Sequence, residues 1–218
     1  MEVLGDSLMS EALEQKLRAA LADTSDVAPR PMSAFELPFK MEKILTPALM
    51  RSLRPAAVLV PVIQRPSGYT VLLTRRADHL RSHKGQISFP GGRRDEEDVS
   101  VAANALREAQ EEVALPPESV EVIGYLDDYP TITRYMVTPV VGIVSGEPPL
   151  FPHEAEVAEL IEVPLEMVLA PDSYERKFFM QSGLKVPFFE LNFGSHRIWG
   201  ATAGMLWNLS QKWTAFNG

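Results

Sequence analysis

Residues 91–115 read GGRRDEEDVSVAANALREAQEEVAL, and this stretch decides the fold class. It opens on two glycines and continues into the clearest helical pattern of the chain, which predicts a helix over Asp98–Leu115. Apolar residues recur at helical offsets and predict one buried face. They are Ala102, Ala105, Leu106, Ala109 and Val113. Two prolines, at 116 and 117, end the helix.

The opposite side of this helix is polar and consists of Asn104, Arg107, Glu108, Glu111 and Glu112. The glutamates stand at i, i+3 and i+4, so their side chains converge within a sector of roughly 100°. Like charges this close repel one another unless a cation neutralises them, and Arg107 can pair with Glu111 one turn on. A solvated acidic helix face is the commoner meaning of such spacing, and at this point it stays open.

The glycines before the helix favour a metal site. Residues Ser82–Asp95 predict a loop in which Gly85, Gly91 and Gly92 let the backbone approach a ligand closely. Backbone carbonyls and carboxylates supply the oxygen ligands that Mg²⁺ prefers, and Mg²⁺ commonly bridges them to phosphate oxygens. The chain has no cysteine, so a metal must be held by oxygen or imidazole. These features indicate hydrolysis of a phosphoanhydride.

Strand patterns flank the helix on both sides. Residues Arg54–Thr74 predict a hairpin, because two β-rich runs are separated by a short turn-forming stretch. After the helix, strands are predicted at Val120–Leu126, Val137–Val144 and Val157–Val163. Strands on both sides of a central helix predict an α/β sandwich with a mixed sheet.

The two ends of the chain carry weaker patterns. A helix with Ser10 as its cap is predicted over Ser10–Leu21, followed by an extended linker over Asp23–Lys40. We therefore divide the chain into an N-terminal helix and linker, 1–40, and a main domain, 41–218. The apolar runs around Gly183 predict a second hairpin, and a final helix is predicted near Thr202–Trp213.

Charge and composition exclude several classes of protein. A formal charge of −8 over 218 residues argues against a protein that coats nucleic acid, because phosphate binding needs a broad surplus of Lys and Arg. The N-terminus lacks the basic start and apolar run of a secretory signal, and no apolar stretch reaches the roughly 20 residues that cross a bilayer. We expect a cytoplasmic protein with no membrane partner.

Residues Gly92 to Leu115 resemble the Nudix box, G-x5-E-x7-R-E-U-x-E-E-x-G-U, in which U is aliphatic. The run REAQEE at 107–112 matches its most specific part. Three positions depart from the pattern: Asp98 stands for the early glutamate, one extra residue precedes Arg107, and Ala114 replaces the late glycine. The resemblance implies a Nudix-type α/β/α sandwich and a pyrophosphohydrolase.

The stretch upstream is similar to the coenzyme A pyrophosphatase branch of that family. The matching positions are Leu72, Leu73, Thr74, Arg76, Leu80, Arg81, His83, Gly85, Gln86 and Phe89–Gly92. Segments 156–165 and 198–204 are similar to the same branch, so the resemblance covers roughly residues 54–205. It implies cleavage of coenzyme A or acyl-coenzyme A to adenosine 3′,5′-bisphosphate and (acyl-)4′-phosphopantetheine.

The resemblance also implies roles for the box residues. Glu108, Glu111 and Glu112 would hold Mg²⁺ or Mn²⁺, with a carbonyl of the glycine loop completing the ligands. Glu108, Glu111 and Arg107 form the catalytic set, in which Arg107 orients the carboxylates. The general base stays open between Glu108 and Glu156, and the alternative for Glu156 is a solvated strand edge.

A cationic run precedes the glycine loop in this acidic chain. Arg76, Arg81 and Lys84 are expected to bind the substrate with Gly91 and Gly92, because guanidinium groups bind phosphate oxygens through paired hydrogen bonds. About half of the run is expected to face solvent instead. His79, His153 and His196 show no ligand spacing and are not expected to bind metal.

Two functions other than coenzyme A hydrolysis stay open, and so does a possible homodimer. The box specifies pyrophosphate chemistry and not the attached groups, so hydrolysis of ADP-ribose or another nucleoside diphosphate derivative is the first rival. A non-catalytic ligand sensor on the same fold is the second, although such a module should have lost box carboxylates. Methionines at 9, 32, 41 and 50 are available for contact in a possible homodimer.

Overall fold

A computed structural model of the chain describes residues 2–27, 30–31, 52–80, 84–181 and 184–217. A large sheet has the strand order β3-β2-β1-β7-β5, with β4 paired to β1, β6 to β7 and β8 to β2. Its strands are β1 (Arg54–Arg65), β2 (Gly68–Arg76), β3 (Ile87–Ser88), β4 (Gly91–Arg93), β5 (Val120–Tyr125), β6 (Tyr129–Pro130), β7 (Tyr135–Val144) and β8 (Val157–Pro164). Strands β1 and β7 run parallel and the other pairs are antiparallel, so the sheet is mixed, as predicted.

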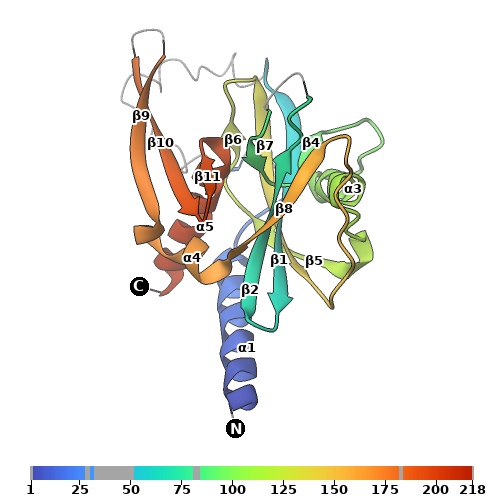
Figure 1. The fold of residues 1–218 in the computed structure, drawn as a ribbon, viewed down its shortest axis with the longest axis vertical. Helices are drawn as coiled ribbons and strands as arrows, with labels where there is room; N and C mark the ends of the chain where they lie inside the picture. The colour runs from blue at the N-terminus through green and yellow to red at the C-terminus, as the bar shows by residue number, and fades with distance from the viewer. Residues whose placement is uncertain (1, 28–29, 32–51, 81–83, 182–183, 218) are drawn as a thin grey trace.

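Helices cover both faces of this sheet, which makes the predicted α/β/α sandwich. Helix α3 (Val101–Val113) lies on one face, and α1 (Glu2–Leu21), α4 (Leu165–Leu169) and α5 (Ala201–Asn217) lie toward the other (Figure 1). A smaller sheet of β9 (Tyr174–Gln181), β10 (Leu184–Phe193) and β11 (His196–Trp199) projects beside α5. Short 3₁₀ turns, η1 (Pro117–Ser119) and η2 (Pro171–Ser173), complete the elements described.

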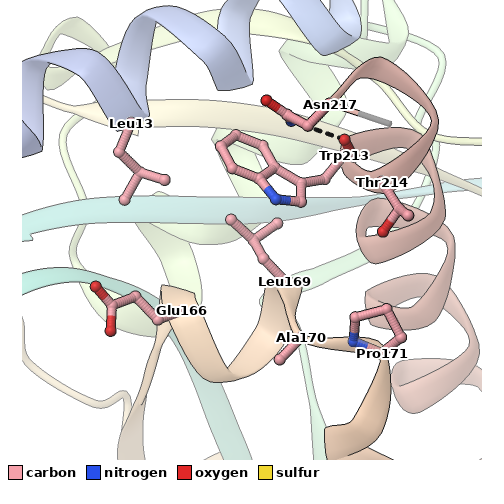
Figure 2. A pocket seen from close by; sticks show the side chains of 8 residues that line it. All are labelled: Leu13, Glu166, Leu169, Ala170, Pro171, Trp213, Thr214 and Asn217. Carbon is pink, nitrogen blue, oxygen red and sulfur yellow. Dashed lines mark hydrogen bonds between the residues drawn. The ribbon is translucent and has the colours of Figure 1, made fainter.

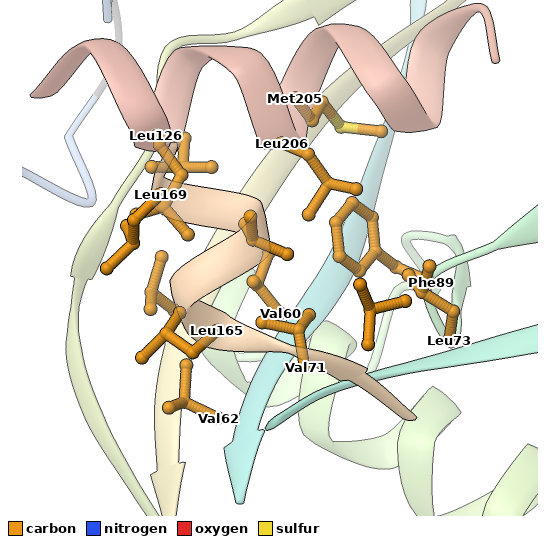
Figure 3. Close-up of a cluster of buried hydrophobic side chains, with 14 of the residues drawn as sticks. Val60, Val62, Val71, Leu73, Phe89, Leu126, Leu165, Leu169, Met205 and Leu206 are labelled. Atoms are coloured by element: carbon orange, nitrogen blue, oxygen red, sulfur yellow. The ribbon is translucent and has the colours of Figure 1, made fainter. Parts of the chain in front are cut away.

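Side chains of β1 point alternately to the two faces of the sheet and contribute to the hydrophobic core on each face. Leu59 and Ile63 belong to the cluster under α3, whereas Val60 and Val62 belong to the cluster under α5. Successive strand residues point to opposite faces, so a strand covered on both faces reads as a continuous apolar run. Figure 3 shows the cluster under α5, in which residues of β1, β2, α4 and α5 pack together with Phe89.

The N-terminal helix is part of this core. Leu17 and Leu21 are each 1% exposed and belong to the cluster under α5. Arg18 forms ion pairs with Glu14 at 2.7 Å and with Glu121 of β5 at 2.6 Å. The helix begins at Glu2, so the expectation that Ser10 caps it is wrong: the serine lies inside the helix. The predicted division between residues 40 and 41 lies outside the described residues.

Part of the predicted linker is held on the domain by a buried ion pair. The Nε atom of Arg30 donates to Asp128 Oδ1 at 2.7 Å, and Nη2 donates to Thr138 Oγ1 at the same distance. The backbone N–H of Asp128 donates to the carbonyl oxygen of Pro31 at 2.9 Å. The Arg30 side chain is only 8% exposed, so this stretch follows the domain surface closely.

Both predicted hairpins are confirmed, β1–β2 and β9–β10, but two local expectations need correction and one strand was not expected. The helix predicted from Asp98 begins at Val101, because the Ser100 side chain caps it by accepting from the Ala103 N–H at 3.0 Å. The predicted loop Ser82–Asp95 contains two short strands, because β3 pairs with β2 and β4 with β1. Strand β11 was not predicted from the sequence.

A cavity of about 470 Å³ lies between α1, α4 and α5 (Figure 2). Its lining is mostly apolar and consists of Leu13, Glu166, Leu169, Ala170, Pro171, Trp213, Thr214 and Asn217. It shares no residue with the carboxylate helix. Among the described helices, none is both long and apolar enough to span a membrane.

Candidate active site on the carboxylate helix

Helix α3 holds its glutamates in place through its buried face. Ala105, Ala109 and Val113 are fully buried against β1 and β7, as the apolar spacing predicted. Packing on this face fixes the rotation of the helix, and it leaves the carboxylate side turned toward the glycines of β4. Asn104 does not follow the prediction of an open polar face. It is fully buried, because its Nδ2 donates to the carbonyl oxygen of Arg93 at 3.2 Å.

Glu112 is the most deeply buried of the three glutamates, with 6% of its surface exposed. Burial raises the pKa of its carboxyl to about 8, and the charges of Glu108 and Glu156 act in the same direction. The Gly91 N–H donates to this carboxylate, and the Arg76 charge also lowers its pKa. A bound cation would therefore favour the ionised form of a carboxylate that burial disfavours.

Glu108 lies against the second glycine of β4. A Cβ atom at Gly92 would stand 2.5 Å from the carboxylate carbon and both oxygens of Glu108, so any other residue there would force the Glu108 carboxylate to move. Burial raises the pKa of the Glu108 carboxyl, and the neighbouring Arg107 opposes that shift. Glu108 and Glu112 are thus brought together beside the two glycines that the sequence singled out.

Arg107 links the start of the helix to its carboxylates. Its Nε and Nη2 atoms each lie 3.0 Å from an oxygen of Asp98, which is 7% exposed. Its Nη1 atom lies 3.0 Å from Glu108 Oε1 and 3.2 Å from Glu111 Oε2. The two hydrogen bonds from Arg107 lower the pKa of the Asp98 carboxyl. Asp98 therefore pairs with Arg107 despite the extra residue between them.

Glu111 stands apart from the other two glutamates. Its side chain is 60% exposed and pairs with Arg107 one turn back, as the i, i+4 spacing predicted. The three carboxylates therefore occupy different environments: Glu112 is buried, Glu108 is partly buried and Glu111 lies at the rim.

Ala114 ends the helix in a conformation that favours glycine. Its φ is 57°, in the left-handed region, and its N–H donates to the carbonyl oxygen of Gln110 at 3.0 Å. The late glycine of the box pattern would occupy this position without strain.

A loop from β7 to β8 closes over the end of α3. The N–H groups of Phe151 and His153 donate to the carbonyl oxygens of Val113 and Glu112, at 3.1 and 2.8 Å. Glu156 follows on this loop and is exposed, directly before β8. Its charge contributes to the raised pKa of Glu112, so the loop carries a fourth carboxylate close to the site. The sequence gives no signal for the hydrogen bonds that hold the loop there.

The cationic run divides into residues with and without partners. Arg75 pairs with Glu159 at 3.0 Å and with Asp78 at 3.3 Å. In contrast, the Nε atom of Arg76 is buried and has no hydrogen-bond partner in the described part of the chain. Lys84 is exposed, and Arg81 lies outside the described residues.

The residues present fit a divalent cation in their chemistry. Glu108 and Glu112 are oxygen donors whose burial is unfavourable without a positive charge, and Gly92 leaves space against Glu108. Within the described ranges, no three acidic or histidine side chains form a ready-made metal cluster. Mg²⁺ usually takes part of its ligands from substrate phosphate oxygens and water.

A glycine loop, a carboxylate helix and a mixed sheet between helices define a class of phosphoanhydride-cleaving domains. The NUDIX domain matches residues 53–181 of this chain. The chain therefore belongs to the Nudix family, and it acts as a Nudix hydrolase on pyrophosphate bonds of small nucleotide substrates.

Several known proteins are similar to this chain. A protein of Yersinia pestis described as an uncharacterized Nudix hydrolase, NudL, is 43% identical over 159 residues, which are 73% of this chain and 79% of that protein. Among solved structures, a Nudix hydrolase of M. smegmatis, RenU, has a TM-score of 0.41 at 27% identity, covering 53% of this chain and 73% of that chain. The NUDIX domain of Shewanella oneidensis NrtR, complexed with ADP ribose, has a TM-score of 0.43 at 22% identity. This match covers 60% of this chain and 84% of that chain.

Proposed function

We propose that this hydrolase cleaves the pyrophosphate of coenzyme A or acyl-coenzyme A, releasing adenosine 3′,5′-bisphosphate and (acyl-)4′-phosphopantetheine. The proposal rests on one observation above all: Glu108 and Glu112 meet beside Gly91 and Gly92, near Arg76, whose buried Nε atom has no hydrogen-bond partner among the described residues. The preference for coenzyme A rests on the similarity of residues 72–92 to that branch of the family and on cations in an otherwise acidic chain.

Glu108 and Glu112 would hold Mg²⁺ or Mn²⁺, which when bound withdraws charge from phosphate oxygens and lowers the pKa of water. Glu111 completes the proposed ligands from the rim of the site. Arg107 fixes the rotamer of Glu108 through the 3.0 Å contact, and Asp98 in turn fixes Arg107. Backbone at Gly91 and Gly92 allows the substrate to approach closely.

The proton of the attacking water needs an acceptor, and two carboxylates are candidates. Glu108 lies in the site itself, whereas Glu156 is exposed on the loop held over Glu112. Glu156 is the stronger candidate in one respect, because a base that is not also a metal ligand keeps its full basicity.

A substrate panel tests the proposal. With Mg²⁺ or Mn²⁺, the kcat/KM for coenzyme A should exceed the values for ADP-ribose, NADH and diadenosine polyphosphates. Chromatography should detect adenosine 3′,5′-bisphosphate and phosphopantetheine, and EDTA should stop their formation. Charge-assisted contacts to the 3′-phosphate could contribute a preference of roughly tenfold for each 1.4 kcal/mol.

Two other outcomes lead to different conclusions. More efficient cleavage of ADP-ribose would refute the coenzyme A assignment and leave the hydrolase assignment intact. If folded, metal-loaded protein cleaves no pyrophosphate in the panel, the chain is better explained as a ligand sensor on a Nudix fold.

A further inference from the structure

Strand β2 ends at an irregularity in its pairing with β8, which lies between two adjacent arginines, Arg75 and Arg76. Residues 75 and 76 pair with β8 in shifted registers, Arg75 opposite Glu159 and Arg76 opposite Val157. A bulge of this kind changes the direction of a side chain relative to a regular strand. The Arg76 N–H donates to the carbonyl oxygen of Gln86 at 2.9 Å, and the Arg76 carbonyl accepts from Gly85 N–H at 3.2 Å. The backbone of Arg76 is therefore fixed on both sides.

The side chain of Arg76 differs from those of other arginines in its hydrogen bonding. Several other arginines in the described residues have carboxylate partners, including Arg75 with Glu159 and Arg107 with Asp98. The Nε atom of Arg76 is buried and unpartnered. Leaving a buried donor without an acceptor costs roughly 1–3 kcal/mol, and more for a charged group. Such an atom points to a ligand that supplies the missing acceptor.

The position of Arg76 identifies the chemistry of that ligand. The N–H of Ala77, the next residue, donates to the carbonyl oxygen of Glu156 at 2.8 Å, and the loop that carries Glu156 is bound to the end of α3 by the hydrogen bond from His153 N–H to the Glu112 carbonyl oxygen, also 2.8 Å. Arg76 therefore lies near the carboxylate helix, where its charge acts on the Glu112 carboxyl. Glu112 itself supplies no acceptor to Nε. A phosphate group suits a buried guanidinium near this site, because its oxygens can accept from Nε and from the neighbouring N–H groups together.

We infer that Arg76 binds non-bridging oxygens of the scissile pyrophosphate and stabilises the charge that develops there during cleavage. Arg76 is therefore a catalytic residue outside the box sequence, contributed by β2. The inference rests on the proposed hydrolysis, but it does not depend on which groups the pyrophosphate carries. A residue on the reacting group must affect all substrates alike, whereas a residue on the 3′-phosphate discriminates between coenzyme A and dephospho-coenzyme A.

The test compares Arg76→Ala with Arg75→Ala on coenzyme A and dephospho-coenzyme A, or on whichever pyrophosphate the wild type cleaves best. Arg76→Ala should lower kcat/KM by about a hundredfold or more on every substrate, because a lost transition-state donor typically costs that much. Arg76→Lys should recover only part of it, because lysine lacks the planar pair of donors. Added guanidinium chloride at millimolar concentration should rescue Arg76→Ala and not Arg75→Ala.

A binding measurement separates this role from a structural one. Adenosine α,β-methylene diphosphate should bind wild type and Arg75→Ala with the same affinity by calorimetry, and Arg76→Ala at least about tenfold more weakly. Circular dichroism checks that each variant is folded, and if Arg76→Ala is not, Arg76→Lys carries the comparison. Unchanged kcat/KM with unchanged binding would overturn the inference, as would a loss confined to coenzyme A. If the wild-type enzyme cleaves another pyrophosphate more efficiently than coenzyme A, only the proposed substrate is refuted, and the inference about Arg76 is tested on that other substrate.

Discussion

Glu112 offers the most direct test at the scale of a single residue. Glu112→Gln keeps the shape of the side chain and removes its charge, so turnover should fall by at least about a hundredfold while circular dichroism stays unchanged. Glu118→Gln is the matched control, because Glu118 is exposed in η1 and should be nearly silent. Wild-type kcat for Glu112→Gln at saturating Mg²⁺ would show that this carboxylate holds no metal.

The raised pKa of Glu112 also makes stability depend on pH. The folded state binds this proton more tightly than the unfolded chain does, because the pKa rises from an ordinary 4.5 to about 8. Metal-free protein should therefore lose stability as pH rises from roughly 5 to 8, by up to a few kcal/mol. Urea unfolding with EDTA across this range measures the slope. Glu112→Gln should flatten it, and parallel curves for the two proteins would contradict the assignment.

Individual site residues could be predicted from the sequence only in part. The spacing of Glu108, Glu111 and Glu112 predicts a shared helix face, and Arg107 does contact the first two. Spacing carries no information on burial, so it could not distinguish the buried Glu112 from the exposed Glu111. Pairing of Asp98 with Arg107 depends on how the loop accommodates the extra residue, and that is a property of the folded chain.

Among the elements, the end of α3 allows a test of backbone strain. Ala114 has a φ of 57°, so Ala114→Gly should raise the free energy of unfolding by about 0.5–1 kcal/mol by relieving backbone strain. Gln110→Gly is the matched control in the same helix, where φ is helical, and it should lower stability by a similar amount. Chemical denaturation measures both. Destabilisation by both glycines would mean that Ala114 is not strained.

Elements with a periodic pattern of their own were predictable, and elements made by pairing were not. Strand β1 and helix α3 carry apolar residues at the spacing of a strand and of a helix, so local sequence identifies them. Strands β3 and β4 have two and three residues, too few for a pattern, and they exist because β2 and β1 pair with them. Strand β11 likewise depends on β10.

For the whole molecule, the question is whether helix α1 folds and unfolds together with the rest of the domain. Leu17 is 1% exposed in the core, so Leu17→Ala should destabilise the entire chain by about 2–5 kcal/mol in one cooperative transition. Glu11→Ala, on the exposed side of the same helix, is the control and should change stability by less than about 0.5 kcal/mol. A separate early transition in Leu17→Ala, with the main one unmoved, would mean that α1 folds independently of the domain.

The packing of α1 on α5 has a consequence during protein synthesis. Leu17 and Leu21 belong to the same cluster as Leu206 and Leu209, which the ribosome adds almost two hundred residues later. Strand β1 must likewise wait for β7 before its parallel partner exists. Until α5 emerges, the nascent chain exposes the apolar surface that it later buries, and such surface is what chaperones bind. High contact order of this kind predicts slow folding that completes only after α5 has emerged.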